Sequence, residues 1–373
     1  MLTTLLVLTS FGEYGMTCQA QETELYPVRV NGKEGYIDAT GRIVIKPQFD
    51  EVSRYFSEGL AKVKVGDKWG YIDKTGRVVI NPQFDGAGAF SEGLAPVKIG
   101  EIYGYIDKIG RIVINPQFDS ASCFSEGLAA VRVGDWENGK SGYIDKTGKY
   151  VINPQYGEAV SFSEGLACVM IGSYRYEDRN NQQWWFIDKN GKYYCQSYSF
   201  SVGFTEGLAI VRNGDKDGMI DRTGRFVINA NSYNSMGYFK EGLSVVKTYN
   251  YSNDDFTLQN ILTGFIDKTG RVVIKLQFNN AQGFSEGLSC VRVGGKYGIG
   301  RYGFIDKTGT YIINPQYNYA KSFKGGIAPV IINNQFQYID KRGVIIWNSA
   351  EFPSYILEEI SNFQKYDYYN LSY

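Results

Sequence analysis

Nine aspartates recur along the chain and are the first candidates for metal binding or acid–base chemistry. Each is followed three residues later by a glycine, and they are Asp38, Asp73, Asp107, Asp145, Asp188, Asp221, Asp267, Asp306 and Asp340. A hard cation such as Ca²⁺ takes six to eight oxygen ligands, whereas each of these aspartates stands alone and is followed by Lys in seven of the nine copies. We therefore interpret them as turn residues and predict no metal site.

Other residues that support catalysis are scarce. The chain contains no His, which removes the commonest general base and most zinc sites. Its five Cys, at positions 18, 123, 168, 195 and 290, have no regular spacing, so they indicate neither a disulfide framework nor a metal site. We expect those beyond the N-terminal segment to be small buried apolar residues. The segment "GIGRYG" at 298–303 matches a phosphate-loop pattern, but no helical pattern follows it. We predict no cofactor, no catalytic residue and no enzyme.

A glutamate also recurs in the motif "SEGL" or its variants. The seven copies are Glu58, Glu92, Glu126, Glu164, Glu206, Glu241 and Glu286, each followed by Gly. A residue repeated seven times is better explained by fixing a loop than by seven separate active sites. We interpret these glutamates as structural.

The overall composition favours a globular protein without a strong charge. The 373 residues include 39 basic and 39 acidic side chains, 43% hydrophobic residues and 15% aromatic residues. This is enough apolar material for a sizeable core. A formal net charge of zero gives no general attraction to nucleic acid or to an anionic membrane. We predict no nucleic-acid partner, and no segment is long and apolar enough to span a bilayer.

The elements that must position these residues follow from the repeated string "KWGYIDKTGRVVINPQFD" at 68–85. Asp followed by Gly at the fourth position, between short β-branched and aromatic segments, is typical of a β-hairpin turn. A further strand precedes it, because "LAKVKV" at 60–65 alternates apolar and charged residues. Each unit is therefore predicted to be a three-stranded meander. The remainder, "NPQFDGAGAFSEG" at 81–93, is predicted to be a tight, 3₁₀-like connector whose Phe side chains join neighbouring units.

Nine such units must stack, since a single meander cannot bury its apolar face. The sequence thus predicts an all-β tandem array of nine three-stranded antiparallel repeats over residues 21–349. The short units, spaced by as little as 33 residues, favour an open solenoid or spiral of blades; the alternative is a closed β-propeller-like ring. The tail, residues 350–373, carries a helical apolar stripe and is predicted to form a short capping helix.

These residues resemble the bacterial WG-repeat (KWG-repeat) proteins over about residues 22–349. The resemblance implies a β-rich tandem array and a binding or scaffolding role, and it brings no catalytic residues. The Trp-Gly pair itself is retained at Trp69-Gly70, and the Trp position otherwise holds Glu34, Tyr103, Ser141, Trp184, Asp217, Thr263, Tyr302 and Phe336. We expect this variable position, here called the Trp slot, to be partly exposed.

The departures from the repeat indicate where a partner binds. Insertions at 135–141, 173–184, 248–263 and 294–302 all fall between the first two predicted strands of a unit. Equivalent turns of a stacked array lie along one edge, and these inserts are rich in residue types that recognition loops use. We predict a non-enzymatic scaffold that binds a protein or carbohydrate partner there. The alternatives are a structural spacer and an enzyme that uses Asp178, Asp254 and Asp255 on a saccharide.

The fifth unit supplies the predicted binding residues Tyr174, Arg175, Tyr176, Trp184 and Trp185. Aromatic and Arg side chains dominate binding energies, and this unit departs furthest from the repeat. Trp185 stands where other units have Gly, and "YYCQSYS" at 193–199 replaces "VVINPQF". The alternative interpretation is that the two tryptophans fill the space left by the missing Pro and Phe, and are buried.

The N-terminal segment allows two interpretations. Residues 1–20 begin with the apolar run "MLTTLLVLTS" and end in "TCQA", which resembles a signal peptide with cleavage after Ala20. The basic region that normally starts such a peptide is missing, because Arg29 is the first cation. A signal peptide predicts export to the periplasm, the medium or the cell surface; without one, the protein is cytoplasmic.

Overall fold

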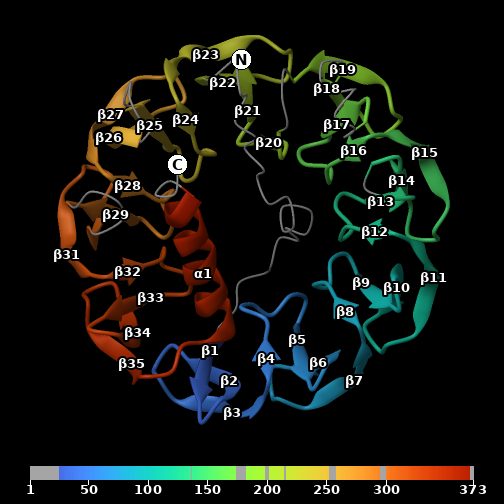
Figure 1. Cartoon of the computed structure of the whole chain (residues 1–373), viewed down its shortest axis with the longest axis horizontal. Coiled ribbons are helices and arrows are strands. Elements are labelled where there is room, and N and C mark those ends of the chain that lie inside the picture. Colours follow the sequence, from blue (N-terminus) through green and yellow to red (C-terminus); the bar gives the residue numbers. More distant parts are fainter. Residues whose placement is uncertain are drawn as a thin grey trace.

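The computed structural model describes residues 25–135, 137–173, 182–197, 201–213, 216–251, 258–294 and 300–369. Within these residues the strands form nine antiparallel sheets, here called blades 1 to 9 in chain order, and there is one helix. The blades stand side by side around a central opening, and the chain passes through them in order (Figure 1). The fold is a nine-bladed β-propeller.

The first five blades have the following strands. Blade 1 has three, β1 (Leu25–Val30), β2 (Lys33–Asp38) and β3 (Ile43–Phe49). Blade 2 has β4 (Glu51–Val52), β5 (Leu60–Val65), β6 (Lys68–Asp73) and β7 (Val78–Phe84). Blade 3 has β8 (Gly86–Ala87), β9 (Leu94–Ile99), β10 (Ile102–Asp107) and β11 (Ile112–Phe118). Blade 4 has β12 (Ser120–Ala121), β13 (Ala129–Val133), β14 (Lys140–Ile144) and β15 (Tyr150–Tyr156). Blade 5 has β16 (Glu158–Ala159), β17 (Ala167–Ile171), β18 (Gln183–Ile187) and β19 (Tyr193–Gln196).

The remaining four blades are followed by the helix. Blade 6 has β20 (Phe204–Thr205), β21 (Leu208–Asn213), β22 (Lys216–Ile220) and β23 (Phe226–Tyr233). Blade 7 has β24 (Ser235–Met236), β25 (Ser244–Tyr251), β26 (Leu258–Ile266) and β27 (Val272–Phe278). Blade 8 has β28 (Asn280–Ala281), β29 (Ser289–Val293), β30 (Arg301–Ile305) and β31 (Tyr311–Tyr317). Blade 9 has β32 (Tyr319–Ala320), β33 (Ile327–Ile332), β34 (Gln335–Asp340) and β35 (Ile345–Ser349), and α1 (Ser354–Tyr369) lies in the central opening (Figure 1).

A fourth strand in blades 2 to 9 goes beyond the expected three. It is two residues long, faces the central opening (Figure 1), and comes from the connector that was expected to be 3₁₀-like. The connector pairs with the adjacent strand because its backbone groups would otherwise be left unsatisfied near the core. In blade 3, for example, Gly88 donates its backbone N–H to the carbonyl oxygen of Pro96 at 2.8 Å.

The recurring aspartates begin turns, as the sequence predicts. Gly76 donates its backbone N–H to the carbonyl oxygen of Asp73 at 2.9 Å. The hydroxyl and backbone N–H of Thr75 donate to Oδ1 of Asp73 at 2.6 and 2.9 Å. The hydroxyl of Thr75 is the main reason that the pKa of Asp73 is lowered. Each recurring aspartate therefore uses its carboxylate to accept hydrogen bonds within its own turn.

The apolar core is divided among the interfaces between neighbouring blades. At the interface between blades 2 and 3, the rings of Tyr71 and Phe90 lie 4.9 Å apart, and the Tyr71 hydroxyl donates to the carbonyl oxygen of Gly88 at 2.8 Å. The cluster there comprises Leu60, Tyr71, Ile80, Phe84, Phe90, Ala95, Val97 and Ile106. The Phe side chains of the connector thus join one unit to the next, as expected.

A polar contact, here called the Glu clasp, joins the "SEGL" loops of neighbouring blades. Between blades 4 and 5, the Glu126 carboxylate accepts the backbone N–H of Gly165 at 3.0 Å and pairs with Lys189 Nζ at 3.1 Å. The preceding Ser125 donates its hydroxyl to the carbonyl oxygen of Phe162 at 2.7 Å. Each clasp therefore adds directional contacts to an interface that is otherwise apolar.

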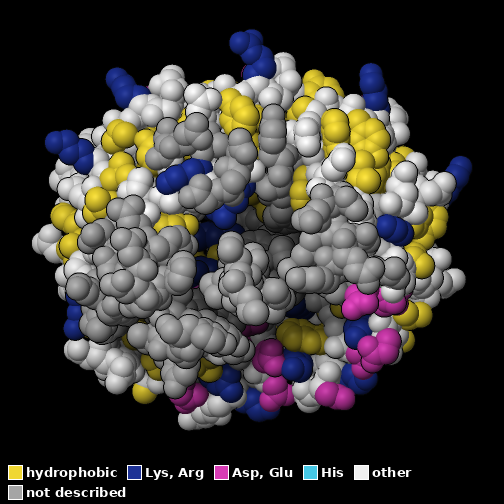
Figure 2. Space-filling view, turned by 45° about the horizontal axis from the view of Figure 1, so that its top comes forward, with side chains coloured by type: hydrophobic (Ala, Val, Ile, Leu, Met, Phe, Trp, Pro, Cys, Tyr) yellow, Lys and Arg dark blue, Asp and Glu magenta, His cyan; other side chains and the backbone are white. Residues whose placement is uncertain are grey.

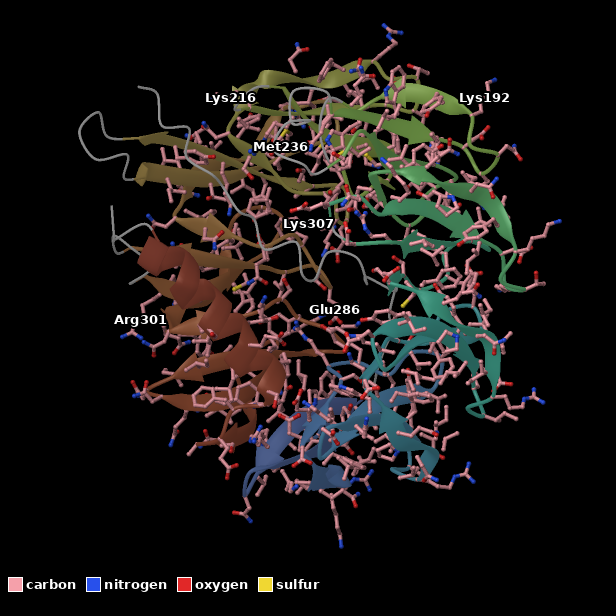
Figure 3. All side chains as sticks on the ribbon, turned by 45° about the vertical axis from the view of Figure 1, so that its right-hand side comes forward. Lys192, Lys216, Met236, Glu286, Arg301 and Lys307 are labelled. Atoms are coloured by element: carbon pink, nitrogen blue, oxygen red, sulfur yellow. The ribbon has the colours of Figure 1, made fainter. Side chains whose placement is uncertain are left out.

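The clasp recurs around the ring. The same ion pair to a Lys or Arg of the next blade is made by Glu58, Glu92, Glu164, Glu206, Glu241 and Glu286. Figure 3 shows Glu286 and Lys307, which belong to two successive clasps, on the inner side of the ring, whereas Lys192 stands on its outer circumference. The clasps thus lie near the central opening.

Each clasp glutamate sits in an unusual backbone conformation. Glu126 and Gly127 have φ of 55° and 88°, and Ser125 and Leu128 exchange backbone hydrogen bonds at 2.9 and 3.2 Å. This is a two-residue type I′ hairpin, whose first position normally favours Asn or Gly. Asn is one methylene shorter than Glu and would not reach the next blade as well. The contact across the interface explains why a residue with an unfavourable local conformation recurs there.

The ring closes where blade 9 meets blade 1. Residues of both blades and of α1 share one apolar cluster, made of Tyr26, Val28, Ile37, Ile327, Ile331, Phe336, Tyr338 and Ile356. The Tyr338 hydroxyl donates to the carbonyl oxygen of Pro27 at 3.0 Å. The array is therefore the closed ring, which the sequence left as the alternative, and not the open solenoid that the sequence favoured.

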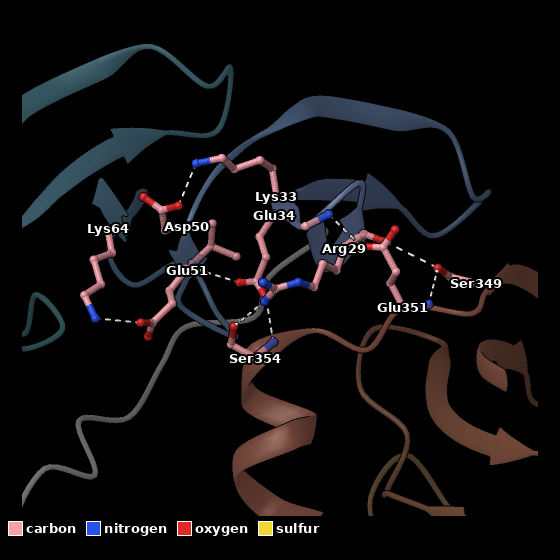
Figure 4. A network of polar contacts seen from close by, with 11 residues as sticks. Arg29, Lys33, Glu34, Asp50, Glu51, Lys64, Ser349, Glu351 and Ser354 are labelled. Atoms are coloured by element: carbon pink, nitrogen blue, oxygen red, sulfur yellow. Dashed lines mark hydrogen bonds and ion pairs between the residues drawn. The ribbon is translucent and has the colours of Figure 1, made fainter. Parts of the chain in front are cut away.

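Polar contacts complete this junction (Figure 4). The Glu351 carboxylate accepts the backbone N–H groups of Asn31 and Gly32, each at 2.7 Å. The Glu34 carboxylate, buried in the Trp slot of blade 1, accepts the N–H of Ser354 at the start of α1. A carboxylate at a helix N-terminus is favourable because the first N–H groups have no partner within the helix. Blade 1 and α1 are thus held in one network.

We expect the substitution Glu126→Ala to lower the free energy of unfolding by about 1–3 kcal/mol, because it removes both contacts across an interface. Urea unfolding measures this. The control is Glu101→Ala, whose side chain is 93% exposed and pairs with Lys98; exposed pairs contribute about 0–1 kcal/mol. Equal losses from the two variants would contradict a special role for the clasp.

The clasps also predict a dependence on pH. Burial raises the pKa of Glu92 and Glu241, but the next blade's Lys and Gly N–H outweigh burial and leave both below the usual 4.5. A carboxyl whose folded pKa is lowered stabilises the fold above its unfolded pKa, and this contribution is lost as the pH falls through the folded value. We therefore expect Glu92→Gln to lose less stability than the wild type between pH 7 and pH 3, measured by urea unfolding. Equal losses would contradict this account.

Candidate binding face

The turns that carry the insertions all emerge on one face of the ring, here called the insert face. Each joins the second and third strands of a four-stranded blade: β13 and β14, β17 and β18, β25 and β26, and β29 and β30. Because all blades have the same strand order and direction around the ring, equivalent turns lie on the same side. Figure 2 views the ring from this side and shows Lys and Arg side chains in the wall of the central hollow.

One cross-strand pair recurs at the equivalent position of the same two strands in every blade. Its first member is Lys or Arg in seven blades, and its second member occupies the Trp slot. The pairs are Arg29 with Glu34, Lys64 with Trp69, Lys98 with Tyr103, Arg132 with Ser141, Met170 with Trp184, Arg212 with Asp217, Lys247 with Thr263, Arg292 with Tyr302, and Ile331 with Phe336. Residues directly opposite in an antiparallel pair are in contact, so each cation has the slot residue as its neighbour.

The cations of these pairs interact with different partners from blade to blade. Lys62 and Lys64 lie over the Trp69 ring, 4.7 and 5.6 Å from its centre, which is a cation–π arrangement. Arg212 Nε pairs with Asp217 Oδ1 at 2.8 Å. In blades 2 and 6 the residue in the Trp slot therefore complements the cation opposite it.

The expectation that the Trp slot is partly exposed is wrong for most blades. Glu34, Thr263 and Phe336 in this slot have exposed fractions of 1%, 0% and 0%. Its side chain packs toward the next blade, as Trp69 does in the cluster between blades 2 and 3. The residue type in the slot differs between blades because the residue opposite it and the contacts with the next blade differ as well.

The five predicted binding residues have different outcomes. Tyr174, Arg175 and Tyr176 lie outside the described residues. Trp184 and Trp185 are both half-buried. Because successive strand residues point to opposite faces, Trp184 packs on the cluster between blades 5 and 6, and Trp185 on the cluster between blades 4 and 5. The two tryptophans therefore do not form one patch.

Trp185 changes the local backbone of blade 5. In blade 2, a Cβ at the equivalent Gly70 would lie 2.5 Å from the carbonyl oxygen of Ile80, because the outer strand passes over the glycine. In blade 5 the outer strand β19 has four residues, whereas β7 of blade 2 has seven, and Ser197 donates its N–H to the carbonyl oxygen of Trp184 at 2.8 Å. The strand "YYCQ" at 193–196 is thus shorter, as a side chain at the position of Trp185 requires.

A small tyrosine-lined pocket at the blade 9–blade 1 junction was not found from the sequence. It is lined by Tyr26, Tyr55, Tyr338, Tyr355 and Arg54 among others. Arg54 Cζ lies 5.0 Å from the ring centres of both Tyr55 and Tyr355. Its residues come from opposite ends of the chain, and the only signal in the sequence is the abundance of Tyr.

The described residues offer little catalytic chemistry. They contain no group of three or more His, Cys, Asp or Glu residues placed to hold a metal ion. Burial raises the pKa of Cys168 to about 12 and of Cys195 to about 11, which keeps both thiols protonated and unreactive. Cys168 and Cys290 are buried, as expected for small apolar residues, whereas Cys195 is half-buried and Cys123 is disulfide-bonded, which the sequence did not predict. Asp178, Asp254 and Asp255 lie outside the described residues.

No helix within the described part of the chain is long and apolar enough to cross a membrane.

Comparison with known proteins identifies the repeat. The family model for the WG containing repeat matches residues 35–69, 69–101, 103–135, 142–174, 218–251, 264–297 and 302–336, which is more than half of the chain. The chain belongs to the WG-repeat family. The stretch between 174 and 218, which this model does not match, includes the WG repeat in which Trp185 replaces the glycine.

Solved structures support the fold of this WG-repeat protein. A structure described as a eukaryotic initiation factor has a TM-score of 0.61 at 12% identity, covering 89% of this chain and 97% of that chain. Dihydro-heme d1 dehydrogenase NirN has a TM-score of 0.45 at 12% identity, covering 90% and 74%. AztD from Citrobacter koseri has 0.41 at 11% identity, covering 88% and 95%. No curated protein matches the chain. At these identities the first likeness supports the fold alone.

The glycine that follows the Trp slot gives a test of the WG repeat itself. In Gly104→Ala the new Cβ would lie 2.5 Å from the carbonyl oxygen of Ile114 and 2.7 Å from the backbone nitrogen of Pro116. We expect a loss of about 3 kcal/mol in the free energy of unfolding, because backbone atoms cannot easily move away.

The control for this test is Gly127→Ala. There φ is +88° but nothing lies within 4 Å of the added Cβ, so the cost should be about 1 kcal/mol from backbone strain. A Gly104→Ala variant as stable as Gly127→Ala would contradict the close approach of the outer strand.

Proposed function

We propose that this WG-repeat protein is a non-enzymatic scaffold that binds a protein or carbohydrate partner through its insert face. The observation that supports the proposal most directly is that the strands flanking all four insertions open on one face of the ring. Loops gathered on a rigid β-scaffold are a common way to build a recognition surface. The repeat supplies the scaffold, and the insertions supply the specificity.

The ring is suited to hold such loops in fixed positions. Every described interface has an apolar cluster, and seven clasps add ion pairs between blades. A binding surface on a rigid support loses less conformational entropy when the partner docks. This argument favours a binding function over a passive spacer, for which loops on one face would have no use.

The chemistry of the insertions favours a polar, uncharged or mixed-charge partner. The sequence 173–184 contains Tyr, Trp, Arg, Asn and Gln, and 248–263 contains Tyr, Asn, Asp and Gln. Aromatic rings with adaptable hydrogen-bonding groups suit both protein surfaces and sugars. The balanced net charge argues against nucleic acid. The absence of His from the sequence and the protonated described thiols argue against catalysis.

Shortened turns test this function. The closing pairs Ile171–Gln183 and Thr248–Leu262 allow residues 172–182 and 249–261 to be replaced by Gly-Asp, the turn that blade 2 uses at 66–67. We expect the doubly shortened protein to keep its melting temperature and to lose at least about tenfold in affinity, since hot-spot side chains contribute 2 kcal/mol or more each.

The partner for this measurement is obtained by photo-crosslinking. A benzophenone amino acid is placed at Gln183 on the insert face or at Ile109, which is 66% exposed in a turn of the opposite face. Crosslinking from Gln183 but not from Ile109, in the native host or on a glycan array, is the expected result. Undiminished affinity of the shortened protein, or equal crosslinking at both positions, would overturn the proposal.

A further inference from the structure

Blade 7 contains a cross-strand pair in which a lysine faces a buried hydroxyl that has no hydrogen-bond partner among the described residues. Lys247 on β25 lies directly opposite Thr263 on β26, in the Trp slot. In blade 4 the equivalent Arg132 is satisfied by the carbonyl oxygens of Gly157 and Asp135. Blade 7 therefore differs from the other blades that carry a cation here.

The side-chain hydroxyl of Thr263 is a buried polar group that is not satisfied by a hydrogen bond among the described residues. Its side chain is fully buried, and its Oγ1 atom has no hydrogen-bond partner among the described residues. A buried polar atom without a partner costs about 1–3 kcal/mol, so such atoms are rare unless they serve a ligand or a water molecule. Most other WG repeats of this chain place an aromatic ring or a charged group in the slot.

Lys247 contributes donors to the same place. Its Nζ donates to Oδ1 of Asn280, on β28 of the next blade, at 2.9 Å. An ammonium group has three N–H donors, so this bond to a described residue uses one of them. Lys247 lies in the middle of β25, and it is half-buried, so solvent can reach it.

A second positive charge adjoins this cluster. Asn280 is directly opposite Arg292 on β29, so the lysine of blade 7 and the arginine of blade 8 approach each other across one residue. Burial and then the charge of Arg292 lower the pKa of Lys247. Two like charges close together are unfavourable, and an anion between them would make the arrangement favourable.

We propose that Lys247, Thr263 and Arg292 form a binding site for one small oxyanion between blades 7 and 8. The anionic group is a carboxylate, sulfate or phosphate, either as a free ion or as part of a larger ligand. One oxygen accepts a hydrogen bond from Lys247 Nζ and another accepts the Thr263 hydroxyl, while the Arg292 guanidinium supplies charge. This site goes beyond the proposed function and does not depend on it.

The plain alternative is a water molecule, which would also bond to the lysine and the hydroxyl. A water molecule satisfies hydrogen bonds but brings no negative charge to the two cations. The two possibilities differ in their response to anions: a water-filled site is indifferent to sulfate, whereas an oxyanion site is stabilised by it in a saturable manner.

The test is thermal unfolding and calorimetric titration of the full-length protein with sodium sulfate, phosphate, acetate or glucuronate, at ionic strength held constant with sodium chloride. We expect a saturable rise in melting temperature with at least one of these ions. Sulfate and phosphate distinguish tetrahedral oxyanions from the carboxylates, and glucuronate tests a carboxylate carried on a sugar.

Variants locate the site. We expect Lys247→Met to weaken anion binding by about tenfold or more, and Thr263→Val by about threefold to tenfold, because each removes a direct contact. The matched control is Lys64→Met in blade 2, whose lysine occupies the same register but pairs with Glu51 at 2.6 Å; its anion response should equal the wild type.

Three outcomes would overturn the proposal. These are no saturable anion effect in the wild type, an effect that Lys247→Met leaves unchanged, or an equal loss in Lys64→Met. Thr263→Val could also be more stable than the wild type by the same amount at every sulfate concentration. The hydroxyl would then not bind an anion, and the assignment of Thr263 to the site would be wrong.

Discussion

The structure depends on the contact between neighbouring blades. No blade has a core of its own, since its apolar side chains meet those of the next blade in clusters such as the one that contains Tyr71 and Phe90. The Glu clasp lies beside each of these clusters from blade 2 to blade 9 and adds contacts with fixed direction. Apolar burial supplies most of the driving force, and the clasps favour one relative placement of the blades. The ring closes through an apolar cluster of the same kind, between blade 9 and blade 1.

That last contact uses residues that do not belong to the repeat. At the position that holds the clasp glutamate in blades 2 to 8, blade 9 has Gly325, and the hydroxyl of Tyr26 donates to the carbonyl oxygens of Lys324 and Gly325. Glu351 and the start of α1 bind blade 1. This helix therefore does more than cover an exposed end, because it links the terminal blades to each other.

Features that depend on neighbouring residues in the chain were predicted from the sequence, whereas features that depend on distant residues were not. The Asp-to-Gly turns, the alternation in "LAKVKV" and the number of units are local features, and the structure confirms them. Closure depends on contacts between residues about 300 positions apart, such as Tyr338 and Pro27, and no local pattern reports these. The structural role of Glu126 was predicted, but its partners Gly165 and Lys189 were not, because they lie in the next blade. The Trp slot was expected to be partly exposed, since side-chain variety is a common sign of exposure; this holds for Trp69, Tyr103 and Trp184, whereas the slot residues of the other six blades are buried.

Hydrogen exchange of single backbone amides tests most directly whether the Glu clasp holds adjacent blades together. Gly165 lies in an "SEGL" loop, yet its N–H is held by Glu126 of the preceding blade. It should therefore exchange as slowly as amides of the adjacent strands. In Glu126→Ala, exchange at Gly165 should speed up strongly, while Gly127, held by Glu92, should stay protected. Fast exchange at Gly165 in the wild type, or no change in the variant, would contradict the account.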